Sequence, residues 1–447
     1  MRKMSIIGAS QIFQSSGLHS LLELYHQQPC KQYSKNNAWN LNTNSNLNNN
    51  NKYNSNRVVP CAELVETSEK RYAVPLGDIY DAYYECIVNK GRTANAMYFT
   101  LNLEKNIRDL WRSINDRTYT IGRSIAFIVT YPIRREVFAA DFRDRVVHDW
   151  ICMRLNPLFE GYLPANMTSN RKGKGNLYAI DLVYDLMEEM SNGYTEDAWI
   201  WKFDLQGFFM SIDKRLLNSK LQKFIDERYF GPDKDTLKWL SEKVIMNCPQ
   251  KNCIRKSPMS AWEGLAKNKS LFGQDDYHGM PIGNLPSQLF ANFLLKDMVD
   301  YLAINGFKCV QYVDDFVVVH KSKAEILAFI PVLRKWLKEM LNISLHPRKC
   351  YIQHYTKGVS FVGGIIKPYR TYTSDRCRRR SLAKMHWIAE GGMGMKEALP
   401  CINSYLGHTK KFTAYKLRKS ISAMLFSAFG KDIYFGKNYL KMNIKTA

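Results

Sequence analysis

Two adjacent aspartates, Asp314 and Asp315, interrupt an apolar stretch that runs from residue 309 to residue 319. The residues on either side are mostly β-branched or aromatic, which predicts a hairpin whose tight turn carries both carboxylates. Like charges at the tip of an apolar hairpin repel each other and lose hydration, and a bound cation would offset both effects. Carboxylate oxygens favour Mg²⁺ or a related ion. The alternative is an exposed Asp-Asp turn that only closes a hairpin.

A third acid, Asp204, ends another apolar stretch at residues 198–205, and a short turn follows it. An acid at the end of a strand can ligate a metal ion, but it can equally cap the next helix. Phosphoryl transfer with two metal ions requires carboxylates from separate strands to converge on both ions. We therefore expect Asp204 to lie beside Asp314.

The chain has 447 residues and a formal charge of +23, and its length allows two or three domains. Such an excess of Lys and Arg suits a polyanionic partner, and nucleic acid is favoured over an anionic membrane. No stretch has the apolar length of a membrane span, and no long hydrophobic signal core follows Met1, so we expect a cytoplasmic protein without a membrane partner. The ten cysteines have no framework spacing, which indicates reduced thiols.

Basic residues gather in three segments. Residues 134–148 predict a strand and turn before a helix, and Arg134 there could hold phosphate or pair with nearby acids. The loop at 170–175 interleaves glycines with cations, among them Arg171 and Lys172, which is typical of an anion-binding loop and of a solvated basic turn. From about residue 371 the pattern is helical and strongly basic, which favours a surface that follows phosphates.

Other segments have clear local patterns. Two amphipathic helices are expected between residues 76 and 114, and a strand at 124–129. A turn-rich loop at 279–288 enters an apolar helix and is expected beside whatever the carboxylates bind. Residues 343–350 predict a strand and turn, and residues 358–364 a hairpin.

In this order, the segments resemble the reverse transcriptases, from about residue 76 to at least residue 368. The positions that carry the resemblance are Asp204 with Phe209, then 283–288, 312–315, 346–349 and 361–363. The resemblance implies an α+β right-hand polymerase fold with fingers, a palm built on an antiparallel sheet, and a helical thumb. The implied divisions are an Asn-rich extension at 1–74, N-terminal helices and fingers at 75–197, the palm with part of the fingers at 198–368, and a basic thumb at 369–447.

The resemblance also implies roles for individual residues. Asp204, Asp314 and Asp315 would hold two Mg²⁺ ions, with Mn²⁺ as an alternative, and Lys349 would assist the leaving group. Phe209 corresponds to a steric gate that selects deoxynucleotides. The other implied positions are nucleotide contacts at Arg171, Lys172, Arg134, Ile282, Gly283 and Gln288, and a primer grip at Phe361 and Gly363.

The motif that begins at Ile282 differs from that of many bacterial members, which carry Gln-Gly and later Ser-Pro. It resembles the motif of diversity-generating retroelements and of related antiphage-defence groups. In the former, an RNA template repeat is copied with errors opposite adenine. An apolar Ile282 in place of an amide offers a physical reason, because polar contacts then no longer discriminate between bases. The implied partners are template RNA, the cDNA primer strand, dNTPs and a small basic accessory protein.

Residues 36–57 are about half asparagine, a composition that cannot bury a core. They resemble the variable segment of the lectin-like proteins that such elements diversify. Because Asn codons begin with two adenines, we hypothesise that residues 36–58 are a translated template repeat, with an ordinary linker as the alternative. Two other functions remain open, an antiphage-defence reverse transcriptase and a non-catalytic RNA-binding protein on the same fold.

Overall fold

The computed structural model describes residues 73–445 except 89, 90, 92 and 132. The chain divides into two units, residues 1–69 and 70–447, and all of the described residues belong to the second unit. The asparagine-rich segment and the hypothesis of a translated repeat therefore lie outside the described residues.

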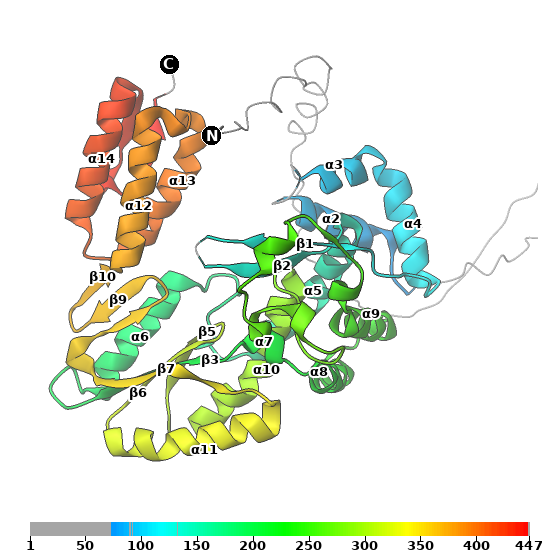
Figure 1. Ribbon diagram of the computed structural model, residues 1–447, viewed down its shortest axis with the longest axis horizontal. Helices are drawn as coiled ribbons and strands as arrows, with labels where there is room; N and C mark the ends of the chain where they lie inside the picture. Colours follow the sequence, from blue (N-terminus) through cyan, green and yellow to red (C-terminus); the bar gives the residue numbers. More distant parts are fainter. Residues whose placement is uncertain (1–72, 89–90, 92, 132, 446–447) are drawn as a thin grey trace, which may run out of the picture. The chain divides into compact units, whose positions relative to one another are not determined.

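Four antiparallel strands form a central sheet in the order β5-β6-β3-β7 (Figure 1). They are β3 (Trp199–Leu205), β5 (Cys309–Tyr312), β6 (Asp315–His320) and β7 (Leu345–His354). The predicted strand and the predicted hairpin are confirmed, with one correction. The turn consists of Val313 and Asp314, while Asp315 is already the first residue of β6 and pairs with Tyr312.

The two faces of the central sheet pack against different partners, because successive side chains on a strand point to opposite sides. On one face, Val317 and Val319 of β6 pack in a cluster with residues of helix α6 (Asn176–Met190). On the other face, Phe316 and Val318 join the main core. Asp315 has the parity of Val317 and Val319, so it lies on the face that α6 covers only in part.

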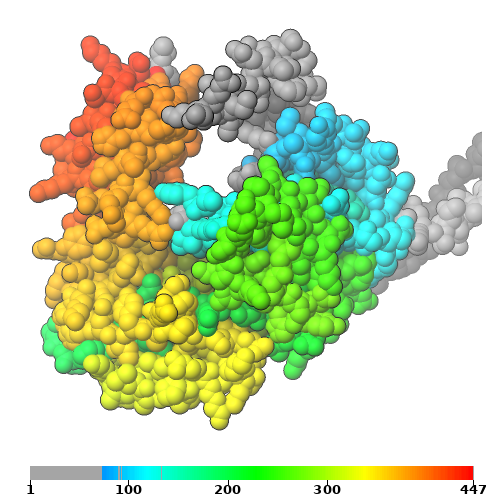
Figure 2. All heavy atoms as spheres, in the orientation of Figure 1, coloured from blue at the N-terminus to red at the C-terminus, as the bar shows by residue number. Residues whose placement is uncertain are grey.

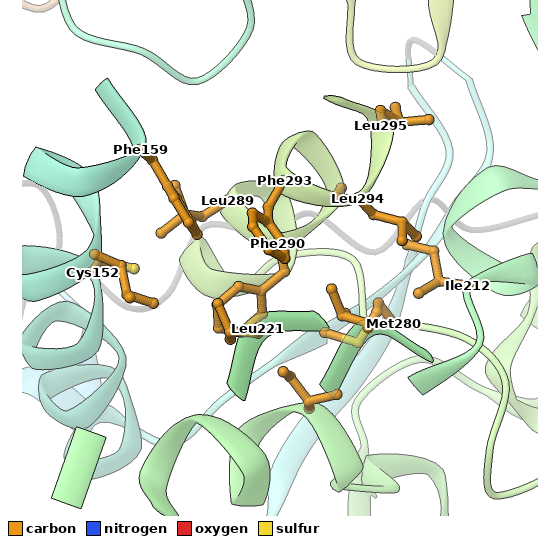
Figure 3. Close-up of a cluster of buried hydrophobic side chains, with 14 of the residues drawn as sticks. Cys152, Phe159, Ile212, Leu221, Met280, Leu289, Phe290, Phe293, Leu294 and Leu295 are labelled. Carbon is orange, nitrogen blue, oxygen red and sulfur yellow. The ribbon is translucent and has the colours of Figure 1, made fainter. Parts of the chain in front are cut away.

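The main core surrounds helix α10 (Leu285–Ile304), which is apolar on nearly all sides and therefore buried. Figure 3 shows side chains of α10 between Phe159 of α5 (Phe142–Tyr162) and Leu221 of α8 (Lys214–Arg228). Pro286 lies in the first turn of α10, as predicted. The remaining helices of this core region are α2 (Leu76–Ile87), α3 (Ala94–Leu101), α4 (Leu103–Asn115), α7 (Phe208–Ser211), α9 (Lys234–Met246) and α11 (Lys323–Leu341). Residues 76–115 thus contain three helices where two were predicted.

A second, small sheet has the strand order β2-β1-β4. Its strands are β1 (Ser124–Val129), as predicted, β2 (Arg135–Ala139) and β4 (Cys253–Arg255). Strand β4 pairs in parallel with β1. It belongs to the irregular segment 247–278, which links α9 to the loop before α10. The sequence patterns did not predict this segment or its strand.

The C-terminal part begins with a three-stranded sheet in the order β10-β9-β8, made of β8 (Val359–Phe361), β9 (Gly364–Lys367) and β10 (Arg370–Thr373). Helices α12 (Asp375–Trp387), α13 (Met395–His408) and α14 (Tyr415–Phe429) follow, with a hairpin of β11 (Ile433–Phe435) and β12 (Met442–Ile444). The predicted hairpin and basic helices are confirmed, whereas β10 and the last hairpin were not foreseen. Within the described part of the chain, no helix has both the length and the apolarity to cross a membrane.

Candidate active site

Three acids meet at the end of the central sheet. The register of β3 and β6 sets Asp204 directly opposite Asp315. The carbonyl oxygen of Asp314 accepts a hydrogen bond from the amide of Leu205 at 3.3 Å, so the turn lies beside the end of β3. Like charges directly opposite each other destabilise a sheet, which means that folding alone does not favour this arrangement. The structure brings Asp204 and Asp314 together as the sequence predicted.

Burial raises the pKa of Asp314 to about 6, and the charges of Asp204 and Asp315 add to that shift. Burial also raises the pKa of Asp315, although the nearby charge of Lys202 opposes the shift. Lys202 Nζ lies 3.6 Å from Asp315 Oδ1 and donates a hydrogen bond to the carbonyl of Ser360 at 2.9 Å. The acids therefore form a concentration of negative charge that the protein neutralises only in part.

Lys349 reaches this cluster because strand β7 is irregular opposite Asp204. Its register shifts there, since Phe203 pairs with Cys350 and Leu205 pairs with Leu345. Such an irregularity changes the direction in which a side chain points. Lys349 Nζ donates a hydrogen bond to Asp204 Oδ2. Burial acts to lower the pKa of Lys349, but the hydrogen bond to Asp204 and the charges of the acids outweigh it and raise the pKa overall.

Buried polar side chains hold the turn that carries Asp314. Ser169 Oγ accepts a hydrogen bond from the amide of Val313 at 3.0 Å and donates one to Asn292 Oδ1 at 3.0 Å. Gln311 Nε2 donates to the carbonyl of Val313 at 2.5 Å. Asn292, Ser169 and Gln311 are all almost fully buried. Sequence reasoning missed these residues, although an asparagine within an apolar helix was a usable signal.

The predicted loop at 279–288 is attached to the small sheet. The amide of Phe138 donates to the carbonyl of Ile282 at 2.9 Å. Gly283 has φ +115°, and a Cβ there would lie 2.7 Å from Val137 Cγ1, so this close approach requires glycine. Ile282 and Phe209 are both half-buried against one apolar cluster, and the amide of Met280 donates to the carbonyl of Phe209 at 2.7 Å. Gln288 is half-buried in the first part of α10.

The predicted phosphate contacts have unequal geometry. Arg171 is 8% exposed, and its guanidinium donates to both oxygens of Glu160 and to the carbonyls of Pro164, Met167 and Leu163. All five of its N–H groups thus have acceptors within the chain, a geometry that does not favour a contact with triphosphate. Lys172 is exposed in the same loop, whereas Arg134 donates to the carbonyl of Ala261.

A neighbouring cation, Arg135, was not selected in the sequence analysis but interacts electrostatically with the acids. Arg135, the exposed first residue of β2, lowers the pKa of Asp314 against the larger effects of burial and the other acids. Arg134 precedes the strand and is bound to the carbonyl of Ala261.

The predicted primer-grip residues lie at the β8-β9 turn. Phe361 is buried, and its ring centroid is 5.8 Å from Lys202 Nζ, which connects this hairpin to the acids. Gly363 has φ +90°, and its carbonyl accepts a hydrogen bond from the amide of Ser374 at 3.0 Å. The hairpin is thus fixed between the central sheet and the start of α12.

Coupled carboxylates on adjacent antiparallel strands, with a lysine bound to one of them, define a site suited to nucleotidyl transfer. The family model described as "Reverse transcriptase (RNA-dependent DNA polymerase)" matches residues 134–366, and the chain belongs to this family. The match includes all three acids and Lys349. Among curated proteins, none matches this chain.

Reverse transcriptases generally use divalent metal ions, and the residues present suit such an ion. Asp204 and Asp314 offer hard oxygen donors, and a divalent cation would offset the burial and the repulsion that together raise the pKa of Asp314. Across the described residues, no group of three His, Cys, Asp or Glu side chains is arranged to hold a metal. One oxygen of Asp204 is instead bound to Lys349.

Proposed function

We propose that this chain is the polymerase of a diversity-generating retroelement, which copies an RNA template repeat into cDNA with errors at adenines. RNA-dependent DNA polymerisation follows from the family, while the residue roles and the biological role are proposed. The observation that carries the residue roles is the coupled charge of Asp204, Asp314 and Asp315 on adjacent strands.

Two divalent ions held by Asp204 and Asp314, with Asp315 in support, would activate a primer 3′-hydroxyl and offset the charge of the triphosphate. Lys349 would protonate the departing pyrophosphate or neutralise its charge, a role that the contact of its ammonium with Asp204 supports. Lys202 holds Asp315 and the β8-β9 hairpin in one arrangement.

Contacts to the incoming nucleotide are proposed for the exposed cations Arg135 and Lys172. Phe209, on the short helix after β3, is proposed as the gate against a ribose 2′-hydroxyl. Arg134, Gly283, Gln288, Phe361 and Gly363 keep their predicted roles as proposals. So do the divisions into fingers at 75–197, palm at 198–368 and thumb at 369–447, and the basic accessory protein.

Primer extension on an RNA template tests the catalytic proposal. Asp204→Asn should lower incorporation by on the order of 10³-fold or more, because the variant keeps the shape of the side chain but loses its charge. Asp226→Asn is the matched control, since Asp226 of α8 lies in a half-exposed ion pair with Lys238 of α9. Equal incorporation by wild type and Asp204→Asn would refute the assignment and support a non-catalytic RNA-binding role.

The half-burial of Ile282 against the same apolar cluster as Phe209 supports the mutagenic role. An apolar side chain here supplies shape but no hydrogen bond to the nascent pair. Sequencing cDNA from a template with adenines at defined positions should therefore show errors concentrated opposite adenine. Ile282→Gln should reduce these errors several-fold, and Ile282→Leu, which stays apolar, should not. An even error spectrum in wild type would contradict the proposal.

The neighbouring DNA separates diversification from antiphage defence. The proposal requires a near-copy of codons 36–58 in an adjacent gene, differing mainly at adenines. Defence genes alongside, with no such copy, would favour the other role.

A further inference from the structure

A cavity of about 270 Å³ opens on the irregular segment 247–278, away from the three acids. The residues that line it include Arg255, Met259, Trp262, Lys267, Ser270 and Phe272. Its volume is near the lower end for small-ligand pockets, which leaves room for one base and its sugar but not for a duplex. This segment belongs to the green part of the surface in Figure 2, where it is exposed to solvent.

The walls of the cavity are planar and partly exposed. Trp262 and Phe272 are half-buried, with ring centroids 5.9 Å apart at an interplanar angle of 80°. The guanidinium carbon of Arg255 lies 4.5 Å from the Phe272 ring centroid. Aromatic rings and arginine planes are the groups on which unpaired bases stack.

A buried carboxylate holds this wall in place. Glu136 of β2 is 1% exposed and accepts hydrogen bonds from Trp262 Nε1 at 2.7 Å, Ser270 Oγ at 2.6 Å and the amide of Leu271 at 2.6 Å. Burying a charge is costly, and here three donors compensate for the cost and fix the orientation of one half-exposed indole.

The charge around the cavity is strongly positive. Residues 249–273 contain five Lys or Arg residues and one Glu. Arg255, Lys256, Lys267 and Lys269 are all exposed, so the phosphates next to a bound base would meet cations.

The rim of the cavity packs against the candidate active site. A Cβ on Gly207 would lie 2.6 Å from the carbonyl oxygen of Asn268, so the rim of the cavity packs against the turn after Asp204. On β2, Arg135 acts on Asp314, and Glu136 on the opposite side of the strand orients Trp262. Strand β2 therefore contacts both the cavity and the candidate active site.

From these observations we propose that the cavity binds one unpaired nucleobase of the template RNA, stacked against Arg255 and Trp262, outside the base-paired region. The inference rests on the proposed polymerase function and adds a second contact for the same template. The site guides a single strand toward the acids, and the cations on its rim hold the adjoining phosphates.

Binding without dNTPs tests this inference on the full chain. Fluorescence anisotropy would compare a primer–template duplex with a ten-nucleotide RNA overhang and the same duplex with blunt ends. Arg255→Ala should weaken binding of the overhang duplex by about tenfold, as expected for the loss of one stack, and leave the blunt duplex unchanged. Arg215→Ala is the matched control, because Arg215 lies 4.5 Å from the Tyr277 ring centroid on the surface but does not line the cavity.

A fluorescent base, 2-aminopurine, placed at successive overhang positions gives a second measurement. Quenching at one position in wild type, and its loss in Arg255→Ala and Phe272→Leu, would support the site. Reversal of the quenching by AMP alone, at the concentration of the overhang strand, would instead assign the cavity to free nucleotides and overturn the inference.

Primer extension with the same preparations separates the two proposals. If wild type extends primers while overhang binding is the same in wild type and Arg255→Ala, the cavity proposal fails and the polymerase proposal stands. If overhang binding depends on Arg255 but no extension occurs, the catalytic assignment fails and the RNA site stands.

Discussion

Two carboxylates, the buried Glu136 on β2 and the half-buried Asp314 in the turn before β6, have opposite environments. Glu136 has three hydrogen-bond donors within 2.7 Å. Asp314 instead faces Asp204 and Asp315, and burial with these charges raises its pKa to about 6. The first carboxylate stabilises the small sheet and its segment, whereas the second weakens the folded state unless a cation binds. This is the difference we expect between an acid that stabilises the fold and one that holds a metal ion.

The largest expected effect comes from Asp314→Asn. Loss of the charge should reduce primer extension by on the order of 10³-fold or more. The same variant should unfold at higher denaturant concentration than wild type, because the repulsion with Asp204 and Asp315 disappears. Extension rates and urea unfolding of the same preparation measure both effects. Lower activity combined with lower stability would mean that Asp314 is structural like Glu136, and the comparison would fail.

Glu136→Ala should show the reverse pattern. Removing this carboxylate leaves Trp262 Nε1, Ser270 Oγ and the Leu271 amide without their acceptor, so the free energy of unfolding should fall by about 2–4 kcal/mol. Urea unfolding followed by tryptophan fluorescence measures the loss. With saturating template, primer extension should fall no more than the folded fraction does, because Glu136 supports the RNA cavity and not the three acids. An unchanged midpoint would show that the hydrogen bonds at Glu136 do not stabilise the fold.

The pH dependence of stability tests the environment of Asp314 directly. The folded-state pKa of Asp314 lies above its unfolded value, so between about pH 4 and pH 6 the folded chain retains a proton that the unfolded chain releases. Stability contributed by this group is therefore present at low pH and is lost as pH rises through 6, by up to about 3 kcal/mol. Urea midpoints of wild type and Asp314→Asn, measured in EDTA, should converge toward pH 4 and diverge by pH 7. Parallel curves would exclude a raised pKa.

Much of this site was predictable because its signals are local. The alternation of residues 309–319 and the acid at the end of 198–205 predicted both strands and the meeting of Asp204 with Asp314. The exact turn was not predictable from preference, since β-branched Val313 adopts φ +57°. The contacts of Arg171 were not predictable either, because the composition of its loop does not reveal that Glu160, eleven residues earlier, binds its guanidinium.

The segment around Glu136 was missed for a different reason. Residues 247–278 have no helical or strand periodicity, and their position depends on contacts with β1 and β2 far away in the sequence. Hydrogen bonds to a single buried carboxylate, rather than a hydrophobic pattern, determine where Trp262 and Ser270 lie. Sequence periodicity therefore predicted the hairpin that contains Asp314, but not the segment that is bound to Glu136.

The smallest expected effect tests whether the acid turn also contains backbone strain. Val313 adopts φ +57°, a left-handed conformation that β-branched residues disfavour, and Ser169 and Gln311 hold it there. Asn tolerates this conformation, so Val313→Asn should raise the free energy of unfolding by about 1 kcal/mol. Val310→Asn, on the same hairpin but in ordinary strand conformation and buried, should destabilise the protein instead. If Val313→Asn is also destabilising, the packing of the valine outweighs its strain, and the cost of the functional turn lies in its charges alone.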